Sequence, residues 1–223
     1  MEAKVKVYGA PWCPDCRRSK QFLGEQRIPY EWIDVDEDPE GMRYIEKINN
    51  GKHIIPTILF QDGSILVEPS DAELAEKLGL RIKAARQFYD VLIIGGGPTG
   101  LSAAIYTARE GMDTLVIEKG GLGGQAAITQ EIENYPGFPE AIAGADLAQR
   151  WESQGARFGV EVLQAQEVTG LEAMGDYRLV RTASGQEYCA SAVLIATGAR
   201  YRRLGVPGVE DFIGAGVHFL RHL

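Results

Sequence analysis

Hydrophobic and polar positions along the first 80 residues predict strands alternating with helices. Lys4–Tyr8 alternates polar and apolar side chains, as a half-buried strand does, and a helical stretch follows over Pro14–Gln26. Turn residues and N-cap residues then divide the remainder. It holds a strand Tyr30–Val35, an acidic helix from Asp36 to Ile48, a hairpin of Thr57–Phe60 and Ile65–Val67, and a helix capped by Ser70 that ends at Leu78 before Gly79.

A different pattern begins near residue 90. Asp90–Ile94 is a continuous apolar run, typical of a strand buried on both faces, and glycines follow it. A helix to Glu110 and a strand at Thr114–Glu118 complete a parallel βαβ unit. Further elements are predicted as a helix at Asp146–Phe158 and strands at Glu161–Gln164, Tyr177–Thr182 and Ala192–Ile195.

These patterns predict an α/β protein with two domains, over residues 1–80 and 90–223. Residues 81–89 read as a short linker or as an extension of the preceding helix. The segment lacks the Gly, Ser and Pro of a long flexible tether, so we expect the two domains to lie close together.

Composition narrows the classes of partner. Of 223 residues, 45% are hydrophobic and 24% charged, which is ordinary for a soluble globular protein. The net charge of −8 argues against nucleic acid or anionic lipid as a main partner. The sequence predicts neither a membrane span nor a secretory signal, so we expect a cytoplasmic protein.

Two of the three cysteines form the sequence Cys13-Pro14-Asp15-Cys16, where a strand gives way to a helix. The start of a helix favours a thiolate, because its backbone N–H groups are unpaired and its dipole is positive. Cys16 lies three residues on, within range to resolve a mixed disulfide at Cys13. Arg17 and Arg18 add positive potential and Asp15 opposes it. Dithiol redox chemistry is therefore the leading prediction, with Cys189 as an inert thiol.

The alternative for this cysteine pair is half of a zinc site. Neither a second C-x-x-C nor a paired His accompanies it, so we expect no metal. His218 and His222 have helical i,i+4 spacing but lack further ligands, and they are a weak candidate for the same reason.

Residues 3–79 resemble a glutaredoxin, most closely the mycoredoxin type. The residues that carry this resemblance are Trp12–Cys16, Ile55-Pro56-Thr57, Asp62-Gly63-Ser64 and Glu68-Pro69-Ser70. It implies a thioredoxin-like fold, Cys13 as nucleophile, and a cis Pro56 whose neighbour Ile55 offers backbone to a substrate cysteine; a trans proline at a strand start is the alternative. Glu68–Asp71 replaces the Gly-Gly-(Ser/Cys)-Asp of glutathione-using members, which leaves the identity of a small thiol open.

The second domain carries a Gly-rich motif with its required context of strand, helix and second strand. Gly95 allows a tight turn, Gly97 lets backbone approach a pyrophosphate, and Gly100 permits close packing of helix on strand. The helix start at Pro98 favours phosphate, and Glu118 can accept hydrogen bonds from a ribose. The alternative is a Gly-rich turn without a ligand.

Residues 87–219 resemble low-molecular-weight thioredoxin reductases. Besides the Gly-rich motif, the matching stretches are Gly123-Gly124-Gln125, Glu133–Phe138, Ala196–Ala199 and Gly205–Gly208. The resemblance implies a Rossmann-like domain that binds FAD. By this resemblance Gly124, Gln125 and Asn134 line the flavin, and the chain returns past the cofactor at Ala196, Thr197, Gly198 and Ala199.

In that family the segment after Gly216–Phe219 reads Cys-Ala-Thr-Cys and enters an NADPH domain. Here Leu220-Arg221-His222-Leu223 stands instead. One choice of codons for these residues reads Cys-Ala-Thr-Cys after loss of one base, so a frameshift is our hypothesis for this end. We expect an incomplete FAD domain, weaker FAD binding and exposed apolar surface.

The prediction is a thiol–disulfide oxidoreductase, a fusion of a glutaredoxin with a thioredoxin reductase. The intact design passes electrons from NADPH through FAD to Cys13 and Cys16, and then to protein disulfides or mixed disulfides of small thiols. In this chain we expect only the glutaredoxin step. The family tends to dimerise, so a homodimer is an expected assembly. The alternatives are a non-catalytic flavin half or a fragment of a peroxiredoxin-reducing flavoprotein.

Overall fold

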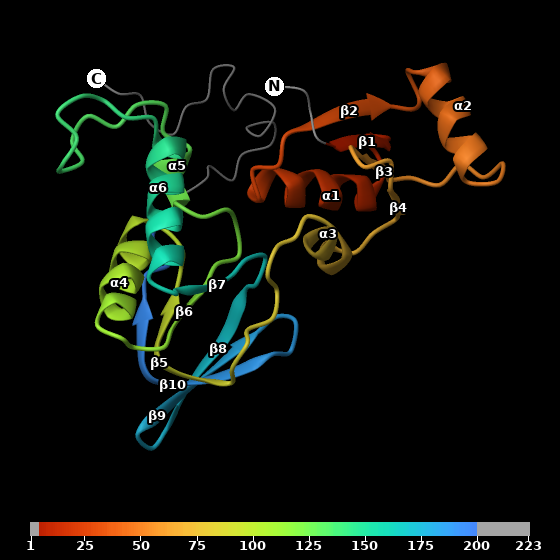
Figure 1. The fold of residues 1–223 in the computed structure, drawn as a ribbon. Coiled ribbons are helices and arrows are strands. Elements are labelled where there is room, and N and C mark those ends of the chain that lie inside the picture. The colour runs from red at the N-terminus through yellow and green to blue at the C-terminus, as the bar shows by residue number, and fades with distance from the viewer. Residues whose placement is uncertain (1–4, 200–223) are drawn as a thin grey trace, which may run out of the picture.

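The alternating segment at the N-terminus becomes an inner strand of the first sheet. The computed structural model describes residues 5–199 (Figure 1). The strands of the first sheet are β1 (Val5–Gly9), β2 (Tyr30–Asp34), β3 (Thr57–Phe60) and β4 (Ile65–Val67). Within the described residues their order is β2-β1-β3-β4, with β1 parallel to β2 and antiparallel to β3. This is the mixed sheet that the predicted order of elements requires.

Local capping sets where the helices around this sheet begin. They are α1 (Pro14–Glu25), α2 (Pro39–Ile48) and α3 (Asp71–Lys77). The Asp38 carboxylate accepts a hydrogen bond from the Glu40 amide, so α2 begins later than the predicted start at Asp36. Ser70 and Glu73 form a reciprocal capping box, which confirms the predicted N-cap of α3. Residues 5–79 are called the N-terminal domain below.

The second sheet holds the predicted βαβ unit. Its strands are β5 (Phe88–Ile94), β6 (Thr114–Ile117), β7 (Glu161–Leu163), β8 (Val168–Met174), β9 (Tyr177–Thr182) and β10 (Glu187–Ile195). Within residues 5–199 the order is β7-β6-β5-β10-β9-β8. The strands β7, β6, β5 and β10 run parallel, and β9 and β8 continue the sheet antiparallel. The sequence did not predict β8, most of whose residues are exposed. Residues 88–199 are called the C-terminal domain below.

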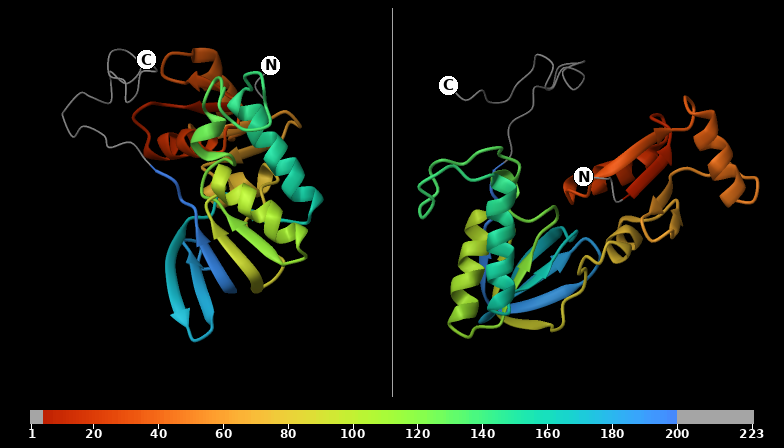
Figure 2. Two further views of the ribbon diagram at one scale, coloured as in Figure 1. Left: turned by 90° about the vertical axis from the view of Figure 1, so that its left-hand side faces the viewer. Right: turned by 45° about the horizontal axis from the view of Figure 1, so that its top comes forward.

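Helices cover one face of this second sheet. They are α4 (Pro98–Arg109), the short α5 (Gly124–Ala127) and α6 (Gly144–Arg157). Figure 1 and the views in Figure 2 show α4 and α6 side by side. Ala104 of α4 is buried with Ile93 and Val116 of the sheet, which explains the continuous apolar run in β5.

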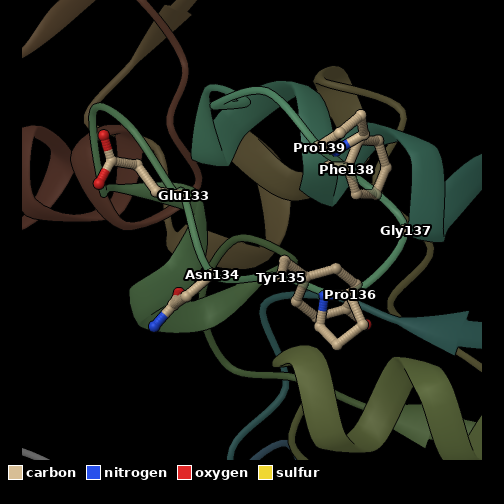
Figure 3. A pocket seen from close by; sticks show the side chains of 7 residues that line it. All are labelled: Glu133, Asn134, Tyr135, Pro136, Gly137, Phe138 and Pro139. Carbon is tan, nitrogen blue, oxygen red and sulfur yellow. The ribbon is translucent and has the colours of Figure 1, made fainter.

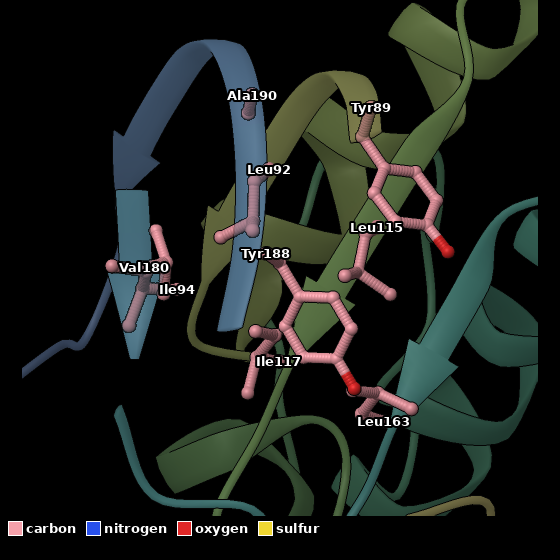
Figure 4. Packing of buried hydrophobic residues seen from close by; sticks show 9 residues of the cluster. All are labelled: Tyr89, Leu92, Ile94, Leu115, Ile117, Leu163, Val180, Tyr188 and Ala190. Carbon is pink, nitrogen blue, oxygen red and sulfur yellow. The ribbon is translucent and has the colours of Figure 1, made fainter. Parts of the chain in front are cut away.

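A further cluster of buried residues in this domain combines aliphatic side chains with two tyrosines (Figure 4). The Tyr89 hydroxyl donates to the Glu161 carboxylate at 2.6 Å, and burial together with this bond raises the pKa of Tyr89. The Tyr188 hydroxyl accepts the backbone N–H of Ala84. The polar ends of both buried tyrosines are therefore satisfied beside the segment that joins the domains.

That joining segment is neither helical nor loose. Gly79 follows α3 with φ +72°, and residues 80–87 form no helix, so the alternative of a longer helix is wrong. Leu80 and Ile82 pack on the core of the N-terminal domain and Ala84 packs on that of the C-terminal domain. β5 begins at Phe88, so the last residues of the predicted linker belong to a strand.

Gly100 is required by packing between the Gly-rich turn and α4. A Cβ at Gly100 would lie 1.9 Å from the Gly95 carbonyl oxygen, and Gly95 itself has φ +111°. A Cβ at Gly97 would have no other heavy atom within 4 Å among the described residues. The motif therefore combines a position closed by packing with one that is open.

We expect Gly100→Ala to lower the free energy of unfolding of the C-terminal domain by about 1–3 kcal/mol through overpacking. Gly97→Ala is the matched control, with a cost below about 1 kcal/mol because its methyl group enters open space. Urea unfolding followed by circular dichroism measures both. Equal losses in the two variants would contradict the packing described here.

Candidate dithiol and dinucleotide sites

Cys13 is the N-cap of α1. Its backbone is extended (φ −72°, ψ 122°), and its Sγ accepts a hydrogen bond from the Cys16 backbone N–H at 3.2 Å. The Sγ also lies 3.8 Å from the Ile55 carbonyl oxygen. The Ile55–Pro56 peptide bond is cis, as the sequence analysis predicted. The strand-to-helix junction and the segment before β3 thus meet at the Cys13 sulfur.

The Cys16 thiol is held in its neutral form. The side chain is fully buried, and burial together with the hydrogen bond to Cys13 raises the pKa of Cys16 from 9.0 to about 12. Cys13 has the helix start and one backbone N–H on its sulfur, and both favour a negative charge. The two cysteines therefore have unequal surroundings, whereas Cys189 lies apart from them in β10 of the other sheet.

The charged neighbours of the pair are engaged elsewhere. The Arg18 guanidinium donates to the Asp15 carboxylate at 2.8 Å and to the Pro69 carbonyl at 2.7 Å. It also lies 3.4 Å from the Asp71 carboxylate. Arg18 thus connects α1 to the start of α3.

Trp12 gives the dithiol an exposed apolar neighbour. Its side chain is 66% exposed, and its indole N–H donates to the Asp36 carboxylate at 2.8 Å. The hydrogen bond holds this exposed ring in place, and Trp12 directly precedes Cys13 in the chain.

The carboxyl ends of the parallel strands form the second candidate site. Open α/β sheets bind ligands at this edge. Gly97 is the N-cap of α4 and supplies no side-chain cap, so the N–H groups of the first turn, Thr99 and Gly100 among them, lack that partner. With open space at Gly97 and Pro98 at the first helical position, this turn suits an anionic ligand.

Glu118 fixes the neighbouring loops. Its carboxylate accepts hydrogen bonds from the Gly96 N–H at 2.6 Å and the Gly120 N–H at 2.7 Å. A carboxylate has about four acceptor positions, so acceptor capacity remains for the hydroxyl groups of a ribose.

A cavity of about 280 Å³ lies at this edge. The predicted residues Gly95, Glu118, Thr197 and Gly198 line it together. A Cβ at Gly95 would meet the Ala196 carbonyl oxygen at 2.3 Å, so the return of the chain after β10 packs on the Gly-rich turn. The residues present fit the adenosine and phosphate half of a dinucleotide. Sequence motifs did not indicate the other lining residues, which are Ile94, Ile117, Lys119, Gln166, Glu167 and Val168.

The residues predicted to line a flavin are less closely gathered. A Cβ at Gly124 would lie 3.3 Å from the Gly97 Cα, and Gln125 follows Gly124 in α5. Asn134 lies instead on a wide open hollow of about 460 Å³ that residues 133–139 line (Figure 3). Tyr135 in this loop stacks edge-on against Trp151 of α6, with ring centroids 5.3 Å apart. Ala199, in the segment that follows β10, is exposed.

The remaining predictions concern a metal site, a membrane span and the residues at the C-terminal end of the chain. Residues 5–199 contain no cluster of His, Cys, Asp and Glu suited to a metal ion. In the same range we find no helix with the length and apolar character that a membrane span requires. His218, His222 and the other residues of the predicted frameshift lie outside the described residues.

Comparison with known proteins identifies both domains. Residues 5–65 match the glutaredoxin family, and residues 89–222 match the pyridine nucleotide-disulphide oxidoreductase family. Thioredoxin reductase of Bacillus subtilis (strain 168) is 43% identical over 133 residues, which cover 60% of this chain and 41% of the relative.

Solved structures give the same result. Thioredoxin reductase from Streptococcus pyogenes MGAS5005 has a TM-score of 0.52 and 44% identity, over 57% of this chain and 41% of that one. The enzyme from Lactococcus lactis has a TM-score of 0.53 and 46% identity, with the same coverage. The chain thus spans about two fifths of the length of these relatives. It belongs to the pyridine nucleotide-disulphide oxidoreductase family and carries a glutaredoxin domain ahead of that region.

Proposed function

We propose that this chain is a thiol–disulfide oxidoreductase in which Cys13 is the nucleophile and Cys16 the resolving thiol. The observation that carries the proposal is the asymmetry of the pair. The Cys13 sulfur accepts the backbone N–H at a helix start, while burial keeps the Cys16 thiol neutral. In such a pair the first sulfur is suited to attack a disulfide, and the second stays protonated until the mixed disulfide has formed.

The exchange proceeds in two balanced steps. The Cys13 thiolate attacks one sulfur of a substrate disulfide, forms a mixed disulfide and expels the other sulfur as a thiolate. Cys16 then gives up its proton to the first departing thiolate and attacks the Cys13 sulfur, which expels the second substrate sulfur as a thiolate. The products are a Cys13–Cys16 disulfide, one substrate thiol and one substrate thiolate that takes a proton from water, so two electrons pass to the substrate.

The surroundings of Cys13 favour an extended cysteine-containing segment or a small mixed disulfide as substrate. Ile55 and Pro56 present backbone beside the sulfur, with the Ile55 carbonyl 3.8 Å from it. Trp12 adds an exposed ring on the same approach. We propose that Pro56 and Ile55 align the attacked sulfur by backbone contact.

The family of the C-terminal domain implies a flavin cofactor, and we propose FAD. The open position at Gly97, the uncapped start of α4 and the Glu118 carboxylate support this choice, since a dinucleotide presents a pyrophosphate and a ribose to these groups. Gly124, Gln125 and Asn134 are proposed for the flavin side. When bound, FAD would supply two-electron redox chemistry between a nicotinamide and a disulfide. NADPH as electron donor, the cytoplasm as compartment and a homodimer as assembly complete the proposal.

Replacement of Cys13 by Ser should lower the rate of mixed-disulfide reduction by about 10³-fold or more, because the attacking sulfur is lost. Cys16→Ser should still form the mixed disulfide but fail to release it by intramolecular exchange. A coupled thiol-exchange assay and mass spectrometry of the trapped adduct measure the two effects. Full activity of Cys13→Ser would contradict the assignment.

The raised pKa of Cys16 predicts a pH dependence of stability in the reduced protein. As pH rises above 9.0, the unfolded chain releases the Cys16 proton before the folded chain does, and the folded state catches up only near pH 12. Folding stability is therefore lost over this interval. The difference in unfolding free energy between wild type and Cys16→Ser should fall as pH rises from 9.0, in urea titrations at stepped pH. A difference that stays constant would show that Cys16 is not protected.

FAD should bind the purified chain at one molecule per chain and give a flavin absorbance band. Gly97→Ala should weaken this binding about tenfold or more, because its methyl group occupies the space that the pyrophosphate needs. Spectral titration with FAD measures the affinity. A chain that binds no flavin, or an affinity that Gly97→Ala leaves unchanged, would refute the dinucleotide site proposed here.

A further inference from the structure

Arg27 occupies a backbone position that favours glycine. It follows the C-cap of α1 with φ +55°, and the Ile28 N–H closes the helix end on the Leu23 carbonyl oxygen. A side chain in this left-handed conformation costs roughly 1 kcal/mol relative to glycine. An arginine at this position suggests that its side chain makes contacts that offset this cost.

The Arg27 guanidinium reaches from the N-terminal domain into the C-terminal domain. It donates one hydrogen bond to the Leu122 carbonyl and another, of 2.9 Å, to the Gly124 carbonyl. These acceptors lie 95 and 97 residues further along the chain, one in the loop between β6 and α5 and the other at the first residue of α5. A planar guanidinium suits this fork of acceptors better than a lysine ammonium does.

Neighbouring residues at the end of α1 extend the contact with this loop. The Gly121 N–H donates to the Glu25 carbonyl at 2.7 Å, and the Gln26 side-chain amide donates to the Lys119 carbonyl at 3.0 Å. Gln26 is 8% exposed. On the other side of the contact, Ala165 packs against the core of the N-terminal domain. The end of α1 is thus docked by backbone hydrogen bonds and apolar contact.

The loop that Arg27 holds is also a wall of the dinucleotide site. The Gly123 N–H donates to the Gly96 carbonyl at 2.7 Å, inside the Gly-rich turn. A Cβ at Gly124 would approach the Gly97 Cα to 3.3 Å, and the Gly120 N–H is bound to Glu118. Residues 119–124 therefore lie between the Arg27 side chain and the groups that would meet the pyrophosphate.

Arg27 also brings positive charge to this region. Burial lowers the pKa of Arg27 and the nearby Glu118 carboxylate opposes that shift. A guanidinium stays charged throughout the physiological range, so the site holds a partly desolvated cation. Its field favours an anionic group at the start of α4.

We propose that Arg27 is a positioning residue that couples docking of the two domains to dinucleotide binding. The N-terminal domain, through Arg27, holds residues 119–124 in the conformation that the pyrophosphate requires, and a bound dinucleotide in turn strengthens docking. This inference rests on the proposed FAD site and adds to it a contribution from the other domain. Coupling of this kind is reciprocal.

Docking at this end of α1 also directs the dithiol. Cys13 caps the opposite end of the 12-residue helix, about 18 Å away by the helical rise. The docked arrangement therefore keeps the Cys13 sulfur away from the Gly-rich turn, at the end of α1 that does not contact the C-terminal domain through Arg27.

The test compares Arg27→Gly with wild type in the full chain. Glycine suits the backbone of this position, so the N-terminal domain should unfold at the same or a higher urea concentration. FAD should bind about tenfold more weakly, and the Gly121 and Gly123 amides should exchange with solvent faster, as spectral titration and hydrogen exchange measure. Arg27→Lys should fall between the two, and the exposed Arg43→Ala should match wild type.

The outcomes separate this inference from the proposed function. Unchanged FAD affinity in Arg27→Gly would overturn the coupling even if exchange of the loop became faster. Unchanged exchange at Gly121 would overturn the docking role of Arg27. A wild-type chain that binds no FAD would overturn both the flavin proposal and the coupling, whereas intact FAD binding with an inactive dithiol would affect the exchange proposal alone.

Discussion

Unpaired backbone N–H groups at two helix starts are the interaction on which both sites depend. α1 and α4 each follow an inner strand of a sheet, so each helix begins at the carboxyl end of that strand. The positive end of each helix dipole therefore lies where a reacting group or ligand can approach. At α1 the N-cap is Cys13, whose own sulfur accepts the Cys16 N–H. At α4 the N-cap is Gly97, which has no side chain and leaves space around it. One junction places a cysteine sulfur at the helix start, and the other leaves room there for a phosphate.

The second constraint is the way the domains are joined. Leu80, Ile82 and Ala84 pack on the two cores, so the connection is a part of the structure and not a tether. Arg27 adds contact from the far end of α1 to the loop after β6. The same helix thus carries the nucleophile at one end and a domain contact at the other.

Sequence patterns predicted the local features well, because these depend on neighbouring residues. The N-cap at Ser70, the stop at Gly79 and the strand β9 all match the structure, and so does the cis Pro56 that the resemblance to glutaredoxins implied. The pattern missed β8 because most of its side chains are exposed, and it missed Gln166 and Glu167 because the cavity that they line exists only after β7 joins the sheet. Arg27 was missed because a basic residue near a helix end is ordinary; its partners lie far along the chain.

We propose that the helix start activates the Cys13 sulfur while burial keeps the Cys16 thiol protonated. The most direct measurement of this claim is limited alkylation of the reduced chain with iodoacetamide at neutral pH, followed by peptide mass spectrometry. We expect the first carbamidomethyl group to appear on Cys13, with Cys16 unmodified while the protein remains folded. Labelling of Cys16 first, or of both cysteines at equal rates, would contradict the claim.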